Sequence, residues 1–411
     1  MTDLDALVGD LDRRLAEADA VLATRYPGDR GVRQPVHTVY VPGDQYDAGT
    51  VGAWAAEAKA ALAAHAGSAA ELASAVPALH EQVYERVIAK LDAEPIEDLR
   101  IDFEDGYGTR SDEEEDAAAV AAARALASTV KDGSAPPFHG LRIKSLEAPS
   151  RRRGVRTLDL FVGELASAGA LTSGFVITLA KVTSVEQIAA MVVVLEAVER
   201  AHPVPKLGFE IQVETPQSIL GPDGVALIPL MIAAGAGRVT GLHYGTYDYS
   251  ASLGVAAAYQ SMEHPVADHA KDVMQLAAAG TGVLISDGST NVLPVGDREA
   301  VHAAWRLHAR LVRRSLERGI YQGWDMHPAQ LPTRYAATYS FYREGLASAA
   351  ARLRAYTGGG DSGYLDEPAT ATALAAYVLR AAECGAATQE EINKLTGLDK
   401  VALAKLAKRP I

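Results

Sequence analysis

Eight short runs of apolar and β-branched residues recur along the chain, and stretches with a helical pattern separate most of them. A strand, a helix and a second strand in succession indicate a parallel pair, because parallel neighbours need a long crossover connection. Eight such units are what a closed (β/α)8 TIM barrel requires, while an open doubly wound sheet is the alternative fold. The eight runs are Val36–Val41, Leu99–Glu104, Gly140–Lys144, Phe175–Lys181, Leu207–Glu214, Arg238–Gly245, Gly282–Asp287 and Gly323–His327.

Two segments exceed a minimal barrel. The residues between Pro42 and Asp98 carry two helical patterns, AGTVGAWAAEAKAALAAHA and SAVPALHEQVYERVIAKL, and more helical patterns follow the eighth strand. We therefore expect a TIM-barrel catalytic domain over residues 1–345, with a helical insertion at about 43–98, and a C-terminal helical extension over residues 346–411. The final stretch, TQEEINKLTGLDKVALAKLA, resembles a helix-turn-helix, and we interpret it as a capping helical hairpin.

The charge balance and composition exclude several classes of protein. Lysine and arginine total 39 against 52 aspartates and glutamates, a formal net charge of −13, which disfavours nucleic acid as a partner. No apolar run approaches the roughly 18 residues of a membrane span. The N-terminus is acidic and amphipathic, unlike a signal peptide. The single cysteine, Cys384, excludes an intramolecular disulfide framework and fits a reducing cytoplasm.

Charged side chains stand at the end of nearly every predicted strand. In (β/α)8 barrels the chemistry gathers at the carboxyl ends of the strands, and burying an unpaired charge is costly. We therefore expect a shared polar cup at this end of the barrel. Its candidate members are Asp102, Glu104, Asp105, Arg142, Lys144, Lys181, Glu210, Gln212, Glu214, His243, Asp248, Asp287, Asp325 and His327.

Several of these residues admit two interpretations. Glu214 and Asp248, on consecutive strands, could together chelate a hard divalent cation such as Mg²⁺, or each could cap the helix that follows it. Arg142 could grip a carboxylate or enolate oxygen, or form a structural bridge with Glu104 or Asp105. Lys181 could form a Schiff base or be a charged structural lysine. The roles of Asp287 and His327 stay open.

Eight motifs in order along the chain resemble those of a known enzyme superfamily. The sequence is similar to the citrate lyase β-subunit and malyl-CoA lyase superfamily of Mg²⁺-dependent 2-oxo acid aldolases. The resemblance covers residues from Val36 to Tyr342 and implies the same TIM-barrel fold. The motifs are TVYVPGD, IDFEDGYG, LRIKSLE, LAKVTS, VETPQSI, HYGTYDYSASLG, ISDG and MHPAQ.

The resemblance also implies roles for particular residues. Glu214 and Asp248 would ligate Mg²⁺, with Mn²⁺ as an alternative ion, and Arg142 would hold the 2-oxo acid or its enolate. Glu104 and Asp105 would order waters or the arginine, and Lys181 would help to bind the substrate. The segment SGYLDEPA is similar to a family segment whose aspartate acts as an acid/base group in a neighbouring subunit. That residue would be Asp366, which would require a homo-oligomer.

The sequence departs from the family pattern at a few positions and leaves the substrate open. Ala180 replaces a usual proline, Lys144 an asparagine and Tyr247 an acidic residue. We expect a Mg²⁺-dependent carbon–carbon lyase or aldolase that acts on a small anionic 2-oxo or hydroxy acid, with or without a coenzyme A thioester. A malate-synthase-like or thioesterase-like condensing or hydrolysing enzyme, or a catalytically silent binding subunit, are the alternatives.

Overall fold

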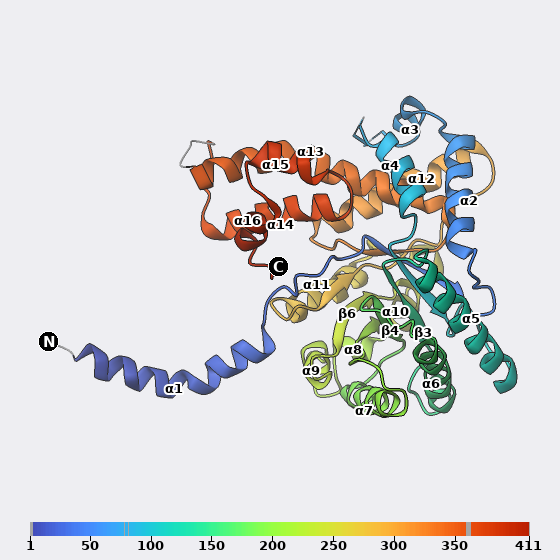
Figure 1. The fold of residues 1–411 in the computed structure, drawn as a ribbon, viewed down its shortest axis with the longest axis horizontal. Coiled ribbons are helices and arrows are strands. Elements are labelled where there is room, and N and C mark those ends of the chain that lie inside the picture. The colour runs from blue at the N-terminus through green and yellow to red at the C-terminus, as the bar shows by residue number, and fades with distance from the viewer. Residues whose placement is uncertain (1–2, 78, 81, 359–362, 411) are drawn as a thin grey trace.

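The computed structural model describes residues 3–77, 79–80, 82–358 and 363–410, and its centre is a parallel sheet curled into a barrel (Figure 1). The sheet order is β7-β6-β5-β4-β3-β2-β1-β8, and a parallel bridge between Ser286 and Gln322 joins its two outer strands. The predicted (β/α)8 TIM barrel is therefore confirmed. The strands are β1 (His37–Pro42), β2 (Asp98–Asp102), β3 (Phe138–Ile143), β4 (Phe175–Leu179), β5 (Phe209–Val213), β6 (Val239–Tyr244), β7 (Leu284–Ser286) and β8 (Gly323–Asp325).

Side chains alternate between the inside of the barrel and the surrounding helices. In β2, Leu99 and Ile101 are fully buried under helices, whereas Asp98, Arg100 and Asp102 point inward and contact polar groups of other strands. This period of two is the geometry of any strand. The barrel interior is consequently polar and charged, and the apolar core lies between the strands and the helices.

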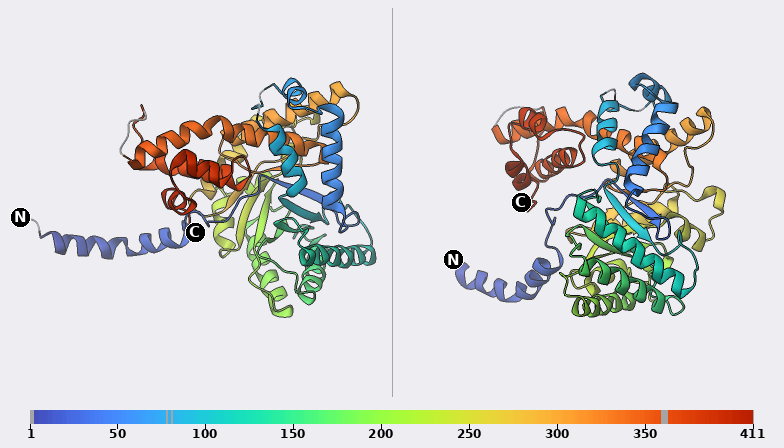
Figure 2. Two further views of the ribbon diagram at one scale, coloured as in Figure 1. Left: turned by 45° about the horizontal axis from the view of Figure 1, so that its top comes forward. Right: turned by 45° about the vertical axis from the view of Figure 1, so that its right-hand side comes forward.

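The crossover helices cover the outside of the sheet, as Figures 1 and 2 show for α5, α6 and α7. Local sequence sets their ends: Ser111 and Glu114 form a capping box at the start of α5, and Gly133 ends it with a φ of 79°. The helices between the strands are α5 (Asp112–Asp132), α6 (Arg151–Ser167), α7 (Val185–Ala201), α8 (Pro216–Ile219), α9 (Ile228–Ala234), α10 (Thr246–Ser252), η1 (Ala257–Tyr259), α11 (Pro265–Ala278) and α12 (Arg298–Glu317), and the short η2 (Pro328–Gln330) follows β8.

The insertion after β1 forms three helices where the sequence predicts two helical stretches. They are α2 (Thr50–His65), α3 (Ala69–Ala75) and α4 (Tyr84–Ala93). The second predicted stretch is divided because α3 ends at Ala75 and α4 begins only at Tyr84. Residues 78 and 81 of that stretch lie outside the described residues.

The C-terminal extension continues directly from the barrel. It consists of α13 (Leu331–Gly358), α14 (Pro368–Glu383), α15 (Gln389–Thr396) and α16 (Lys400–Leu406). The expected domain boundary at residue 345 falls inside α13, so one helix belongs to both parts. The final two helices form a hairpin that turns at Gly397, with a φ of 72°, and buries Ile392 and Leu403 against the extension. None of the described helices is long and apolar enough to cross a membrane.

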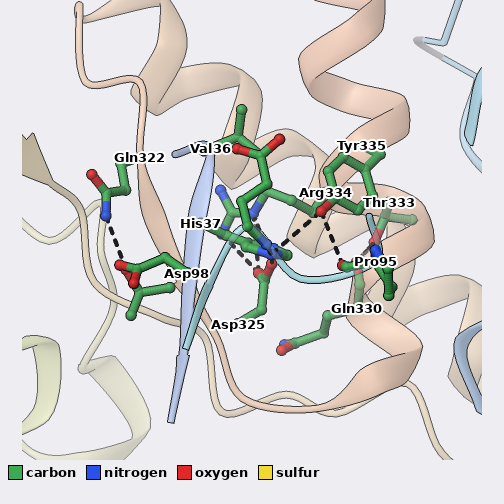
Figure 3. A network of polar contacts seen from close by, with 12 residues as sticks. Val36, His37, Pro95, Asp98, Gln322, Asp325, Gln330, Thr333, Arg334 and Tyr335 are labelled. Carbon is green, nitrogen blue, oxygen red and sulfur yellow. Dashed lines mark hydrogen bonds and ion pairs between the residues drawn. The ribbon is translucent and has the colours of Figure 1, made fainter. Parts of the chain in front are cut away.

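A buried ionic network joins β1 and β8 on the outside of the barrel (Figure 3). The carboxylate of Asp325 contacts His37 Nδ1 at 2.8 Å, His308 Nε2 at 3.0 Å and the Arg334 guanidinium at 2.8 Å. Burial alone would raise the pKa of Asp325, but Arg334 and the two histidines hold that pKa well below its usual range. This network closes the barrel next to its eighth strand and leaves Asp325 no access to the cup.

Candidate functional site

The ammonium group of Lys181 lies among three carboxylates that follow two strands, β2 and β6. Its Nζ is 2.9 Å from Asp105 Oδ2, 3.2 Å from Glu104 Oε1 and 3.4 Å from Asp248 Oδ2. The backbone N–H of Lys181 donates to Glu214 Oε1 at 2.7 Å. Residues that follow β2, β4, β5 and β6 therefore meet at one point, as the sequence predicts for the carboxyl ends of these strands.

The backbone at Lys181 is strained. Its φ of 51° lies in the left-handed region, which residues other than glycine rarely adopt. Such a conformation costs about 1–3 kcal/mol and is retained where the surrounding contacts fix it, often at functional sites. Here the hydrogen bond to Glu214 holds the strained peptide, so the position of Lys181 is tied to that carboxylate.

Glu214 is buried at the end of β5 and is held from two sides. Besides the bond from Lys181, its Oε2 accepts a hydrogen bond from Gln212 Nε2 at 2.5 Å. Gly245 leaves room for the carboxylate, because a Cβ there would lie 2.8 Å from Oε2. Burial raises the pKa of Glu214 to about 8, against the opposing effects of Lys181 and Arg142. A cation bound nearby would stabilise the charged form of so strongly desolvated a carboxyl group.

Arg142 lies buried at the floor of the cup. Its Nε and Nη2 donate to the two carboxylate oxygens of Asp102 at 2.7 and 2.6 Å, and its Nη1 donates to Gln212 Oε1 at 3.1 Å. Glu104 is farther, at 3.6 Å, so the principal partner is Asp102 rather than the Glu104 or Asp105 considered from sequence. Burial would lower the pKa of Arg142, but Asp102 and the other acidic neighbours raise that pKa by more than burial lowers it. The guanidinium therefore stays charged.

Two aromatic rings flank this guanidinium and were not anticipated as site residues. The Arg142 guanidinium lies 4.7 Å from the ring centre of Tyr40 and 5.6 Å from that of Trp324. Both rings are half-buried and lie 4.5 Å apart. The signal that could have found them is the period-two alternation of β1, which places Tyr40 on the same inner face as Thr38.

The site carries more acidic than basic groups. Among the described residues around Lys181 and Arg142 there are five carboxyl side chains, those of Asp102, Glu104, Asp105, Glu214 and Asp248. Burial raises the pKa of Glu104 to about 7, a second sign of crowded, desolvated carboxyls. An excess of carboxylates in a partly buried cup attracts cations.

The donor set suits a hard divalent ion. Within the described part of the chain, no three carboxylate, imidazole or thiolate side chains are arranged as a metal site. A site built on Glu214 and Asp248 needs only two, since Mg²⁺ commonly binds one or two protein carboxylates and takes its remaining oxygens from water and substrate. Both lie beside Lys181: Asp248 pairs with its ammonium, and Glu214 accepts a hydrogen bond from its backbone N–H. The residues fit Mg²⁺ in type and charge.

Other predicted members of the cup lie elsewhere. The expectation is wrong for Asp287 and Asp325, which face the surrounding helices: Asp287 binds Lys271 Nζ at 3.0 Å and accepts a hydrogen bond from Ser315 Oγ. Lys144 pairs with Glu115 of α5 at 2.7 Å. His327 accepts from the backbone of Ala329 and so caps η2.

A second polar layer fills the barrel beneath Arg142. Arg100 Nη2 donates to Glu210 Oε2 at 2.9 Å, and His243 Nε2 lies 3.2 Å from Glu210 Oε1. Glu210 therefore pairs with a buried arginine below the cup, and His243 pairs with Glu210. Their role is to support the floor.

Asp366 lies away from the cup of its own chain. It follows α13 and accepts a hydrogen bond from Arg352 Nε at 3.0 Å. In Figures 1 and 2 the end of α13 and the start of α14 lie at the far end of the extension from the barrel. The neighbouring Leu365 is 94% exposed. A role for Asp366 in catalysis therefore requires the cup of another subunit.

Comparisons with known proteins place the chain among others of this fold. A family model described as a domain of unknown function (DUF6986) matches residues 15–411. None of the curated protein sequences matches. Among solved structures, the chain is similar to a citrate lyase from Burkholderia xenovorans LB400, with 20% identity and a TM-score of 0.58 over 89% of this chain and 97% of that chain.

Malate synthase from Haloferax volcanii is also similar in structure. Its magnesium and glyoxylate complex has 13% identity and a TM-score of 0.51 over 74% of this chain and 75% of that chain. Its native form at 3 mM glyoxylate has the same identity and TM-score over 93% and 100%. At these identities the likeness shows a shared fold, which is the fold that the sequence resemblance implies.

Proposed function

The chain belongs to the DUF6986 family, and from the geometry of its cup we propose that it is a Mg²⁺-dependent carbon–carbon lyase. The enzyme would cleave or form a bond beside a 2-oxo or 3-hydroxy acid, free or as a coenzyme A thioester. The observation that carries the proposal is the meeting of Glu104, Asp105, Asp248 and Glu214 around Lys181, directly above the buried Arg142.

Glu214 and Asp248 would hold the ion, and Mn²⁺ would suit the same oxygens. When bound, Mg²⁺ acts as a Lewis acid on the carboxylate and carbonyl oxygens of a 2-oxo acid. The malate synthase of the same fold is described as a magnesium and glyoxylate complex, which supports an ion and a 2-oxo acid in such a cup.

The remaining residues of the cup would bind the substrate and stabilise its charge. Breaking a carbon–carbon bond beside a carbonyl leaves an enolate, and Arg142, fixed by Asp102, supplies positive charge that needs no rearrangement. Lys181 at the mouth of the cup would bind an anionic group of the substrate. Glu104 and Asp105 would order water and hold the side chains of Arg142 and Lys181 in place. Tyr40 and Trp324 would keep bulk water from the guanidinium.

Lys181 is unsuited to the Schiff-base alternative. A lysine that attacks a carbonyl must be neutral, which requires a lowered pKa. Burial would lower the pKa of Lys181, but Glu214, Glu104 and Asp105 together raise it above its ordinary value. The ammonium form is therefore the stable one, which favours metal activation over a covalent adduct.

The direct test is a screen of 2-oxo and 3-hydroxy acids with aldehydes and acyl-CoA thioesters, followed by mass spectrometry. We expect turnover of at least one pair with Mg²⁺, its loss with EDTA, and no adduct after borohydride. A net condensation or thioester hydrolysis in the same screen would assign the malate-synthase-like or thioesterase-like alternative. Turnover that resists EDTA and leaves a borohydride adduct on Lys181 would contradict the proposal, as would a chain silent towards every pair.

We further propose that Asp366 serves as the acid/base group in a neighbouring subunit's cup. Glu214→Gln and Asp366→Asn chains, each inactive alone, should regain activity when they are co-expressed with different tags and purified as mixed assemblies. A two-chain mixed assembly has one intact site, so about half of the native activity is expected. Glu367→Gln is the matched control and should stay active alone. Mixed assemblies without activity would place Asp366 outside the reaction.

A further inference from the structure

The N-terminal helix α1 (Leu4–Arg25) meets the body of the protein at its last turn, where Thr24 and Arg25 line a hollow together with residues of α9. No residue of this 22-residue helix is buried, and the helix projects from the barrel in every view (Figures 1 and 2). Its large apolar side chains are exposed: 67% for Leu4, 44% for Leu11, 50% for Leu15 and 56% for Leu22. A soluble protein rarely leaves such a stripe uncovered.

Six apolar residues of α1 follow a heptad spacing, and the exposed Leu7 and Val21 lie beside them. Leu4, Val8, Leu11, Leu15, Ala18 and Leu22 are separated alternately by four and three residues. That period of 3.5 residues is the pattern of a coiled-coil seam, with Val8, Leu15 and Leu22 at the a positions and Leu4, Leu11 and Ala18 at the d positions. A helix that packs on its own globular body needs only the ordinary helical period.

The segment that follows α1 is bound to the body of the protein, whereas the helix itself is exposed. After the helix, the backbone N–H of Gly28 donates to the Gly280 carbonyl at 2.8 Å. The C-terminal Arg409 pairs with Asp29 at 3.3 Å and donates to the Val32 carbonyl at 2.9 Å. The helix therefore leaves the body from an anchored base, as an arm that presents its seam outward.

We propose that α1 pairs with α1 of a second copy of this chain as a parallel, two-stranded coiled coil. The charges beside the seam favour this orientation. Asp5, Asp12 and Asp19 occupy the e positions, and Arg14 occupies a g position. In a parallel pair, Arg14 faces Asp19 of the second copy on both sides of the seam.

An antiparallel pair would bring like charges together. Aligning the same apolar seam head to tail sets Arg14 against Arg14 and Asp12 against Asp12 of the second copy, which is unfavourable. A membrane surface is a poorer occupant still. Five acidic side chains and three arginines lie on α1, whereas helices that bind anionic lipid carry lysine and arginine on their polar face.

The first test is the mass of the full-length chain in solution, by light scattering after size exclusion. Leu11→Asn with Leu15→Asn places two amides in the seam, and Ala16→Asn with Ala20→Asn places the same amides on the outer face. We expect the seam variant to have half the mass of the native assembly and the outer-face variant to keep it. Because no residue of α1 is buried within its own chain, the body of each subunit should stay folded in both variants, as circular dichroism would show. A seam variant with the native mass would overturn the proposal.

The second test distinguishes the two orientations. Cys384 is the single cysteine, so Cys384→Ala gives a cysteine-free background. In a parallel pair, Leu4→Cys and Leu22→Cys chains should each form disulfide-linked dimers with themselves under mild oxidation. Dimers that form only when the two variants are mixed would show an antiparallel pair and overturn the parallel arrangement.

Discussion

Replacing Glu214 by glutamine is expected to weaken Mg²⁺ binding at least about a hundredfold and to abolish Mg²⁺-dependent turnover. The substitution keeps the shape of the side chain and removes the anionic oxygen that a hard cation needs. Titration calorimetry with Mg²⁺, or paramagnetic resonance with Mn²⁺, measures binding without reference to activity. Native Mg²⁺ affinity in the Glu214→Gln chain would contradict the assignment of the ligand.

The Glu214→Gln chain should stay folded, so that a loss of Mg²⁺ binding reports on the ligand and not on unfolding. Because burial raises the pKa of Glu214 to about 8, its surroundings favour the neutral form, which an amide resembles. One hydrogen bond from Gln212 loses its acceptor, which costs about 1 kcal/mol. The matched control is Glu147→Gln, an exposed carboxylate after β3, which should bind and turn over normally.

The strand ends could be predicted from sequence because each apolar run stops at a polar residue, and parallel strands bring those ends to one edge. The direction of each side chain could not be predicted in this way. Successive residues of a strand point to opposite faces, so the direction depends on whether a residue is odd or even along its strand. Trp324 points into the barrel, so the next residue, Asp325, points to the helices. The prediction by position therefore places Asp325 in the cup and misses Trp324.

The contacts of the site depend on register and on a backbone conformation that no local pattern indicates. Asp102 and Arg142 are direct partners across β2 and β3, which explains their bidentate pair, but that register is known only once the barrel is closed. The left-handed φ of Lys181 is likewise invisible in the sequence LAKVTS. It places the ammonium over the cup instead of continuing the strand direction.

Arg142→Lys is expected to lower turnover by about a hundred- to a thousandfold, the cost of removing one group that stabilises developing negative charge. Lysine keeps the charge but cannot donate in parallel to both oxygens of Asp102 and also reach Gln212. The ammonium group of the substituted lysine would therefore not be held in the direction of the enolate. Steady-state kinetics with the substrate pair found in the screen measures the effect.

The pattern of parameters separates this role from a structural one. Arg142 does not belong to the ion's ligand set, so Mg²⁺ affinity should stay within a few-fold of native while kcat falls. Arg110→Lys, at an exposed arginine beside Asp44 near the same edge, is the matched control and should leave every parameter unchanged. A native kcat in the Arg142→Lys chain would show that the guanidinium serves only to pair with Asp102. Mg²⁺ and Lys181 would then be the groups that stabilise the enolate.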